Sequence, residues 1–181
     1  MFESLLVKLA EAFQRSSIPY MVIGGQAVLQ YGEPRLTRDI DITLGVAIDR
    51  TSDILSLVQQ IGLHAAVNDV VGFVKNTNVL PVSEGTTGIR VDLLFSFTPY
   101  EREAIGRATP IRVGNFPVQY ATVEDTIIHK IVAGRARDLD DVKGIVARHP
   151  DHDVLYIEKW LQSLGNTLAI DLITRYKTIP S

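Results

Sequence analysis

Apolar and polar positions follow a helical period at the start of the chain. The apolar residues there recur at spacings of three and four positions: Leu5, Leu6, Leu9 and Phe13. This pattern predicts an amphipathic helix. Residues 18–25, IPYMVIGG, form a short apolar run that predicts a buried strand entering a tight glycine turn. Residues 26–32 then predict a short helix, because Gly32 and Pro34 are typical stop signals.

The middle of the chain is rich in short apolar segments. Residues 39–45, DIDITLG, predict a second strand, and residues 51–61 predict a helix. Three further segments with β-branched and apolar residues predict strands: residues 71–76 (VGFVKN), 78–83 (NVLPVS) and 89–96 (IRVDLLFS). Residues 110–116 and 117–122 flank a Gly-Asn pair and predict a hairpin.

The last third of the chain is helical in its pattern. From Val123 onward the spacing of apolar residues predicts helices, with breaks near Pro150 and Gly165. The order of elements therefore predicts an α/β (α+β) fold, with a mixed β-sheet flanked by helices. We expect residues 1–121 to form this core and residues 122–181 to form a helical C-terminal region, packed together as one compact unit.

Composition narrows the class of protein. The chain has 181 residues, 18 of them basic and 21 acidic, with a net charge of −3. This balance argues against broad, sequence-independent nucleic-acid binding, but a local basic patch could still dock one RNA end. The chain has no cysteine, which excludes disulfides and cysteine–zinc sites and suits a reducing compartment.

The sequence carries no sign of membrane targeting. Charged residues at Glu3, Lys8 and Glu11 interrupt any apolar core of a signal peptide. No apolar run approaches the length of about 18 residues that a membrane-spanning helix requires. We therefore expect a soluble, cytoplasmic protein.

Two aspartates lie one residue apart in an otherwise apolar strand. Asp39 and Asp41 share one face because side chains alternate along a strand, and this leaves Ile40 and Ile42 for a core. Two close carboxylates repel each other, and both stay ionised comfortably only beside a cation such as Mg²⁺. Such a pair on its own is more often a solvent-facing strand or a helix N-terminal cap than a metal site.

The surrounding sequence changes that balance. Asp92 lies in another apolar segment, RVDLLF, which is a natural place for a third carboxylate on a neighbouring strand. Gly24 and Gly25 lie at a predicted strand-to-helix turn, where backbone N–H groups can approach a phosphate. A Gly-Gly pair alone could simply make a turn. The combination of glycines and carboxylates favours a phosphate and metal site.

This combination resembles the DNA polymerase β-type nucleotidyltransferase superfamily. Within it, GGQAVLQYG…RLTRDIDI and HKIVAGRARDLDDV are most similar to AbiEii-type, or minimal nucleotidyltransferase, proteins, which are often found in toxin–antitoxin pairs. The resemblance covers about residues 18–148. It implies a nucleotidyltransferase-type mixed sheet and transfer of a nucleoside monophosphate from an NTP. The acceptor stays open between an RNA 3′ end such as that of tRNA, a protein and a small molecule, and a cognate antitoxin is a candidate partner.

The resemblance also implies roles for single residues. Gly24 and Gly25 would cradle the triphosphate. Asp39 and Asp41 would hold two metal ions, Mg²⁺ or Mn²⁺. Asp92 would complete the metal site and help to activate the acceptor hydroxyl.

The helical region supplies the cationic residues that the resemblance implies. Lys130 matches the family's helix lysine and is expected to act in catalysis and to bind the nucleotide. Asp138 matches the acidic residue of an Arg-x-Lys-Asp motif and is expected to belong to the nucleotide site. Here the motif has arginine at its third position, which keeps the charge but puts the role of Arg137 in doubt. Arg135 is expected to bind the nucleotide.

Two arginines before the acidic strand complete the set of cationic candidates. Arg38 is also expected to bind the nucleotide, although it points away from Asp39 in a regular strand and is the least suited to touch the metals. Arg35 is a further available cation. The acidic run after Asp138 lacks the spacing of a calcium loop and predicts a polar helix start.

Two other functions stay open. The same fold could serve as a non-catalytic nucleotide-binding or partner-binding module, or the acidic strand could be ordinary surface. Three converging carboxylates favour an enzyme, because a pure binder has no need of them.

Overall fold

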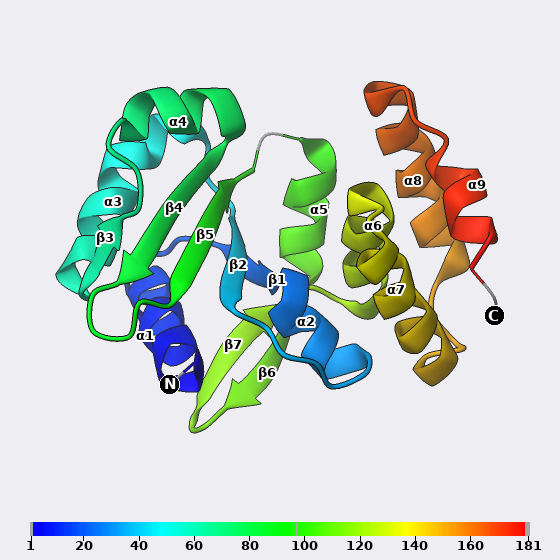
Figure 1. Ribbon diagram of the computed structural model, residues 1–181, viewed down its shortest axis with the longest axis horizontal. Helices are drawn as coiled ribbons and strands as arrows, with labels where there is room; N and C mark the ends of the chain where they lie inside the picture. The colour runs from blue at the N-terminus through cyan, green and yellow to red at the C-terminus, as the bar shows by residue number, and fades with distance from the viewer. Residues whose placement is uncertain (1, 97, 180–181) are drawn as a thin grey trace.

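The computed structural model describes residues 2–96 and 98–179. The described residues form a seven-stranded mixed sheet in the order β3-β4-β5-β2-β1-β7-β6 (Figure 1). Its strands are β1 (Tyr20–Ile23), β2 (Asp39–Leu44), β3 (Leu63–Ala65), β4 (Val79–Glu84), β5 (Arg90–Phe95), β6 (Thr109–Val113) and β7 (Phe116–Tyr120). The helices are α1 (Phe2–Arg15), α2 (Gly24–Tyr31), α3 (Thr51–Gln60), α4 (Val70–Thr77), α5 (Pro99–Arg107), α6 (Val123–Ala133), α7 (Ala136–Arg148), α8 (Val154–Leu168) and α9 (Leu172–Lys177).

The centre of the sheet mixes strand directions. Strand β2 runs parallel to β5 and antiparallel to β1, and β1 runs parallel to β7. The predicted fold class, a mixed sheet flanked by helices, is therefore confirmed. The predicted hairpin is confirmed too, since β6 and β7 pair as antiparallel strands around Gly114 and Asn115.

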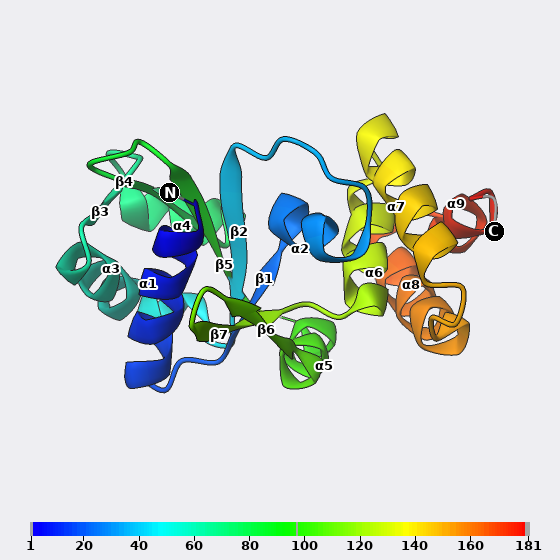
Figure 2. The same cartoon turned by 90° about the horizontal axis from the view of Figure 1, so that it is seen from below.

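Two hydrophobic clusters cover the two faces of the sheet. Helices α1 and α3 pack on one face, where Ile40 and Ile42 of β2 are also buried. The second cluster joins α2 and α5 to helices α6–α9. Helices α6–α9 lie together at one end of the molecule (Figures 1 and 2). The predicted first helix is confirmed, and its apolar stripe belongs to the first cluster. The alternation of β2 thus sends its isoleucines to one face and its aspartates to the other.

One predicted strand is wrong. Residues 71–76 lie in helix α4, which begins after Asp69, whose side chain accepts a hydrogen bond from the Gly72 N–H, and ends at Asn78 in the left-handed conformation. Val74 is buried, whereas Val71 is 73% exposed. A short apolar run does not distinguish a helix from a strand by periodicity, and here the caps decide for the helix.

Two helix boundaries also differ from the predictions. Helix α8 passes through Gly165 and ends at Leu168. A Cβ atom at position 165 would lie 2.7 Å from the Ile170 carbonyl oxygen. This glycine therefore allows the segment between α8 and α9 to pack closely against α8, and it does not end the helix. The predicted break near Pro150 is confirmed, and an unpredicted one occurs at Gly134, where φ is +64°.

Helix α5 and strand β3 were not predicted. Helix α5 starts with a capping box between Thr98 and Glu101, which the sequence displays as Thr-Pro-x-Glu. The division of the chain at residue 121 stays a prediction. Within the described residues, no helix combines the length and the apolarity needed to cross a bilayer.

Candidate active site

The site begins at the turn that joins β1 to α2. Gly24 has φ +64°, and a side chain at this position would collide with the carboxylate of Asp41, which pairs with Ile23 across the strands. A Cβ atom at Gly25 would lie 2.6 Å from Cγ2 of Thr37. Glycine is therefore required here so that the backbone can approach both the acidic strand and the following loop.

The three predicted carboxylates line one cavity of about 360 Å³. Asp41 and Asp92 are direct partners in the parallel pair of β2 and β5, so their side chains lie on the same face of the sheet. Asp39 lies two residues earlier on that face. Asp92 accepts a hydrogen bond at 3.0 Å from Nε of Arg90, an exposed residue beside the cavity.

The folded protein disfavours the charged form of Asp41. Burial, and then the negative charges of Asp39 and Asp92, raise the pKa of Asp41 to about 6. Lys130 and Arg135 act in the opposite direction and lower this pKa. A bound cation would relieve the repulsion among the three carboxylates.

A network of ion pairs, in which Arg135 is exposed and the other side chains are largely buried, contributes four residues to the lining of the cavity. Nζ of Lys130 lies 2.8 Å from Asp138 and 3.0 Å from Asp141. Nε of Arg135 lies 2.6 Å from Asp138, and Nε of Arg35 lies 3.0 Å from Asp141. We call these five residues the ion network. It joins the loop before β2 to helices α6 and α7.

The ion network explains the lowered pKa of Asp138. Burial alone would raise the pKa of Asp138, but hydrogen bonds from Arg135 and Lys130 hold it below the usual value. Lys130 itself is 5% exposed and lines the cavity. Because a buried charge needs partners, the ion pairs with Asp138 and Asp141 compensate the burial of the lysine and fix its position.

Asp141 is the residue that the sequence reasoning missed. It was predicted to be part of a polar helix start, yet it is only 9% exposed and holds Lys130 and Arg35 together. The available signal was its spacing of three residues from Asp138, which places both carboxylates on one face of a helix.

The remaining arginines divide between the cavity and the surface. Arg137 lines the cavity and donates a hydrogen bond of 3.1 Å to the Leu36 carbonyl oxygen. Arg38 is exposed and lies outside the residues that line the cavity. The predicted nucleotide contact of Arg38 therefore stays without support from this geometry.

The carboxylates are chemically suited to a divalent metal but do not form a preassembled cluster. Across residues 2–96 and 98–179, no group of three or more His, Cys, Asp or Glu side chains is close enough to hold a metal ion. Three oxygen-donor side chains in one polar cavity, with the pKa of Asp41 raised, nevertheless fit the ligand preference of Mg²⁺.

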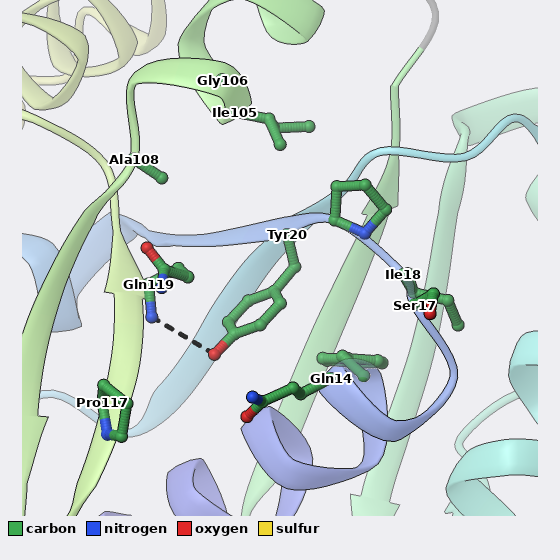
Figure 3. Close-up of a pocket in the computed structure, with 11 residues that line it drawn as sticks. Gln14, Ser17, Ile18, Tyr20, Ile105, Gly106, Ala108, Pro117 and Gln119 are labelled. Carbon is green, nitrogen blue, oxygen red and sulfur yellow. Dashed lines mark hydrogen bonds between the residues drawn. The ribbon is translucent and has the colours of Figure 1, made fainter.

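A larger cavity of about 520 Å³ lies elsewhere, between the end of α1, the start of β1 and the end of α5 (Figure 3). Tyr20 points into it and accepts a hydrogen bond from the Gln119 N–H. Among residues 2–96 and 98–179, none of those that line this cavity is an Asp, Glu, Lys, Arg or His. Its chemistry therefore does not suit a charged substrate, and the smaller acidic and cationic cavity is the candidate active site.

Comparison with known families identifies the family of the chain. Residues 5–167 match the family model described as nucleotidyl transferase AbiEii toxin, type IV TA system. The chain belongs to the AbiEii nucleotidyltransferase family. The match spans both walls of the cavity, the glycine turn with its carboxylates and the ion network of this AbiEii family member. No curated protein matches the chain.

Solved structures support the fold of the AbiEii family member. An antigenic nucleotidyltransferase-like protein from Paracoccidioides brasiliensis is 15% identical with a TM-score of 0.59, over 97% of this chain and 91% of that one. The antibiotic-resistance factor ANT(2'')-Ia is 18% identical with a TM-score of 0.54, over 97% and 89%. The lincosamide antibiotic adenylyltransferase LnuA, bound to lincomycin, is 15% identical with a TM-score of 0.53, over 76% and 91%. At such identities the likeness shows a nucleotidyltransferase-type fold.

Proposed function

We propose that this AbiEii family member transfers a nucleoside monophosphate from an NTP to an acceptor hydroxyl, with a divalent metal as cofactor. The observation that carries the proposal is that Asp39, Asp41 and Asp92 and four cationic side chains line one cavity at a glycine turn. An NTP brings both the phosphate charge that the cations would bind and the metal that the carboxylates would share.

The triphosphate would lie along the ion network. Lys130, Arg135 and Arg35 carry the positive charge, and the N–H groups at the start of α2 would add hydrogen bonds at Gly24 and Gly25. A lysine held by two carboxylates is already oriented, so little freedom is lost when the phosphates bind.

The three carboxylates of β2 and β5 would act on the reacting atoms. Asp39, Asp41 and Asp92 would hold Mg²⁺ or Mn²⁺, which when bound neutralises phosphate charge and polarises the phosphoryl oxygens. Asp92 would also accept the proton of the acceptor hydroxyl as its oxygen bonds to the α-phosphorus and pyrophosphate leaves. Arg90, whose Nε lies 3.0 Å from Asp92, would hold that carboxylate in position.

The acceptor and biological role are part of the same proposal. The family description names a toxin of a type IV toxin–antitoxin system, which supports a toxin role with a cognate antitoxin. Small molecules, proteins and RNA ends are all candidate acceptors. The neutral to acidic composition favours recognition of one acceptor group over broad binding to nucleic acid.

The test is a labelling experiment with each radioactive NTP, Mg²⁺, total RNA, total protein and a small-molecule fraction. We expect one fraction to take up label, and we expect Asp41→Asn to abolish the uptake. Asp140→Asn, which changes an exposed carboxylate on α7, serves as the matched control. A second readout is thermal stability, which should rise with Mg²⁺ and NTP together. Stabilisation by NTP without any labelling would favour a non-catalytic binding module.

A further inference from the structure

A second cavity of about 240 Å³ adjoins the candidate active site. The two cavities share five residues: Gly24, Asp41, Lys130, Arg135 and Asp138. The residues that line only the second cavity are three apolar side chains and one histidine: Ile23, Leu94, Ala133 and His129. We call this second cavity the annex. The site thus divides into a charged part and a part with an apolar lining.

The histidine of the annex is uncharged and incompletely satisfied. Burial lowers the pKa of His129 to about 4, so its ring is neutral at pH 7. Its Nε2 atom is covered and has no hydrogen-bond partner in the described part of the chain. The ring of Tyr100 contacts the ring of His129 in a tilted arrangement, with centroids 5.7 Å apart. Leaving a buried polar atom unpaired is unfavourable, so a ligand that supplied a partner for Nε2 would stabilise the complex.

We propose that the annex binds the base of the nucleoside triphosphate, a planar, uncharged nitrogen heterocycle, and that His129 helps to select among bases. This inference rests on the proposed function, in which the charged cavity holds the triphosphate. The volume of the annex is below the range of about 300–1,000 Å³ that is typical for larger ligands, which suits a base better than a whole nucleotide. Bases also pack well on apolar and ring surfaces.

The acceptor is the alternative occupant, and the distribution of charged residues argues against it. Asp92, proposed to take the acceptor's proton, lines the cavity of the candidate active site but not the annex. Arg35 and Arg137 also line only that cavity. Asp41 and Lys130 lie at the junction of the two cavities, where the phosphate that carries the ribose and base would have to lie. The acceptor would therefore bind in the cavity of the candidate active site, and the annex remains for the base.

The first experiment fills the annex without disturbing the fold. Ala133 is exposed at the end of α6, and Ala133→Phe would place a ring in the mouth of the annex. Ala136→Phe makes the same substitution at an exposed alanine that lines neither cavity. Dissociation constants would be measured by calorimetry with Mg²⁺ for ATP, CTP, GTP, UTP and inorganic tripolyphosphate. We expect Ala133→Phe to weaken the best NTP at least tenfold and to leave tripolyphosphate within twofold, and Ala136→Phe to change neither.

The second experiment addresses selectivity. His129→Leu should reduce the ratio between the best and the worst NTP by up to about tenfold, the effect of one hydrogen bond. His129→Gln can place a polar atom near the position of Nε2, so it should restore part of the ratio. Melting temperatures of all variants report whether they are folded.

Each contrary result has a distinct meaning. Unchanged NTP binding with lost transfer in Ala133→Phe would assign the annex to the acceptor and overturn the inference. Equal weakening of tripolyphosphate and NTP would assign it to the phosphates, with the same consequence. Equal affinity of the wild-type protein for all four NTPs would remove the selective role of His129. If the wild-type protein bound neither NTP nor tripolyphosphate, the proposed function itself would fail.

Discussion

The substitution Asp41→Asn should make the metal-free protein more stable at neutral pH while it removes activity. Asparagine keeps the size of the side chain but cannot ionise. Burial and the charges of Asp39 and Asp92 raise the pKa of Asp41 from 3.8 to about 6, which means that the folded protein disfavours the charged form. Removing the charge removes that penalty.

The size and sign of the effect follow from linkage. A shift of about 2 pKa units corresponds to about 3 kcal/mol, and because the carboxylate borders an open cavity we expect about 2 kcal/mol. Because the pKa of Asp41 is raised in the folded protein, its protonation stabilises the folded state, and this stabilisation is fully present below pH about 4. The contribution is lost as the pH rises through about 6. The difference between variant and wild type should therefore be near zero at pH 4 and reach about 2 kcal/mol by pH 8.

The assay is urea unfolding in EDTA at several pH values between 4 and 8, for wild type, Asp41→Asn and the control Asp140→Asn. For a chain of this size, about 2 kcal/mol corresponds to a rise in melting temperature of about 4–8 °C. Adding Mg²⁺ with NTP should reverse the order, because only the wild type keeps its full set of ligands. The control should show a difference that does not depend on pH.

A single result would refute this reasoning. If metal-free Asp41→Asn is less stable than wild type at pH 8, the carboxylate of Asp41 makes net favourable contacts in the folded protein. Its role would then be structural, and the metal assignment would lose its main support.

Three other changes test the ion network and the packing. Lys130→Met should lower kcat/KM by about 10- to 1000-fold while Lys143→Met, at an exposed position of α7, should not, and equal activity of the two would remove Lys130 from the site. Asp141→Asn should lower the free energy of unfolding in urea by about 2 kcal/mol and raise KM for NTP, and unchanged values would make this carboxylate a bystander. Gly165→Ala should destabilise by about 1–3 kcal/mol because its Cβ would meet the Ile170 carbonyl oxygen, and a higher melting temperature would contradict that close approach.

The acidic half of the site was accessible from sequence because its signals are local. The period of two in β2 separates Ile40 and Ile42 from the aspartates without any knowledge of the neighbours. Pairing of Asp41 with Asp92 was a reasonable expectation, since both lie in short apolar strands. The parallel register that makes them direct partners comes from the tertiary fold.

The ion network could not be predicted in full because its pairs are distant in the chain. Arg35 and Asp141 are 106 positions apart, and no local pattern connects them. Lys130 was assigned to the site by the resemblance, but its burial between two carboxylates depends on the turn at Gly134 that places α7 against α6. Helix α4 shows the same limit, because its apolar run fits either secondary structure until its caps are considered.

The ion network joins residues far apart in the sequence, so it can form only after most of the chain has been synthesised. The glycine turn and all three carboxylates are synthesised well before Lys130, Asp138 and Asp141. A chain still emerging from the ribosome can therefore fold its acidic strands early, since folding begins during synthesis. Such a chain has no oriented lysine for a triphosphate until α6 and α7 have docked. On the proposed function, a translation product that stops before α7 would lack the oriented lysine and would not transfer nucleotides.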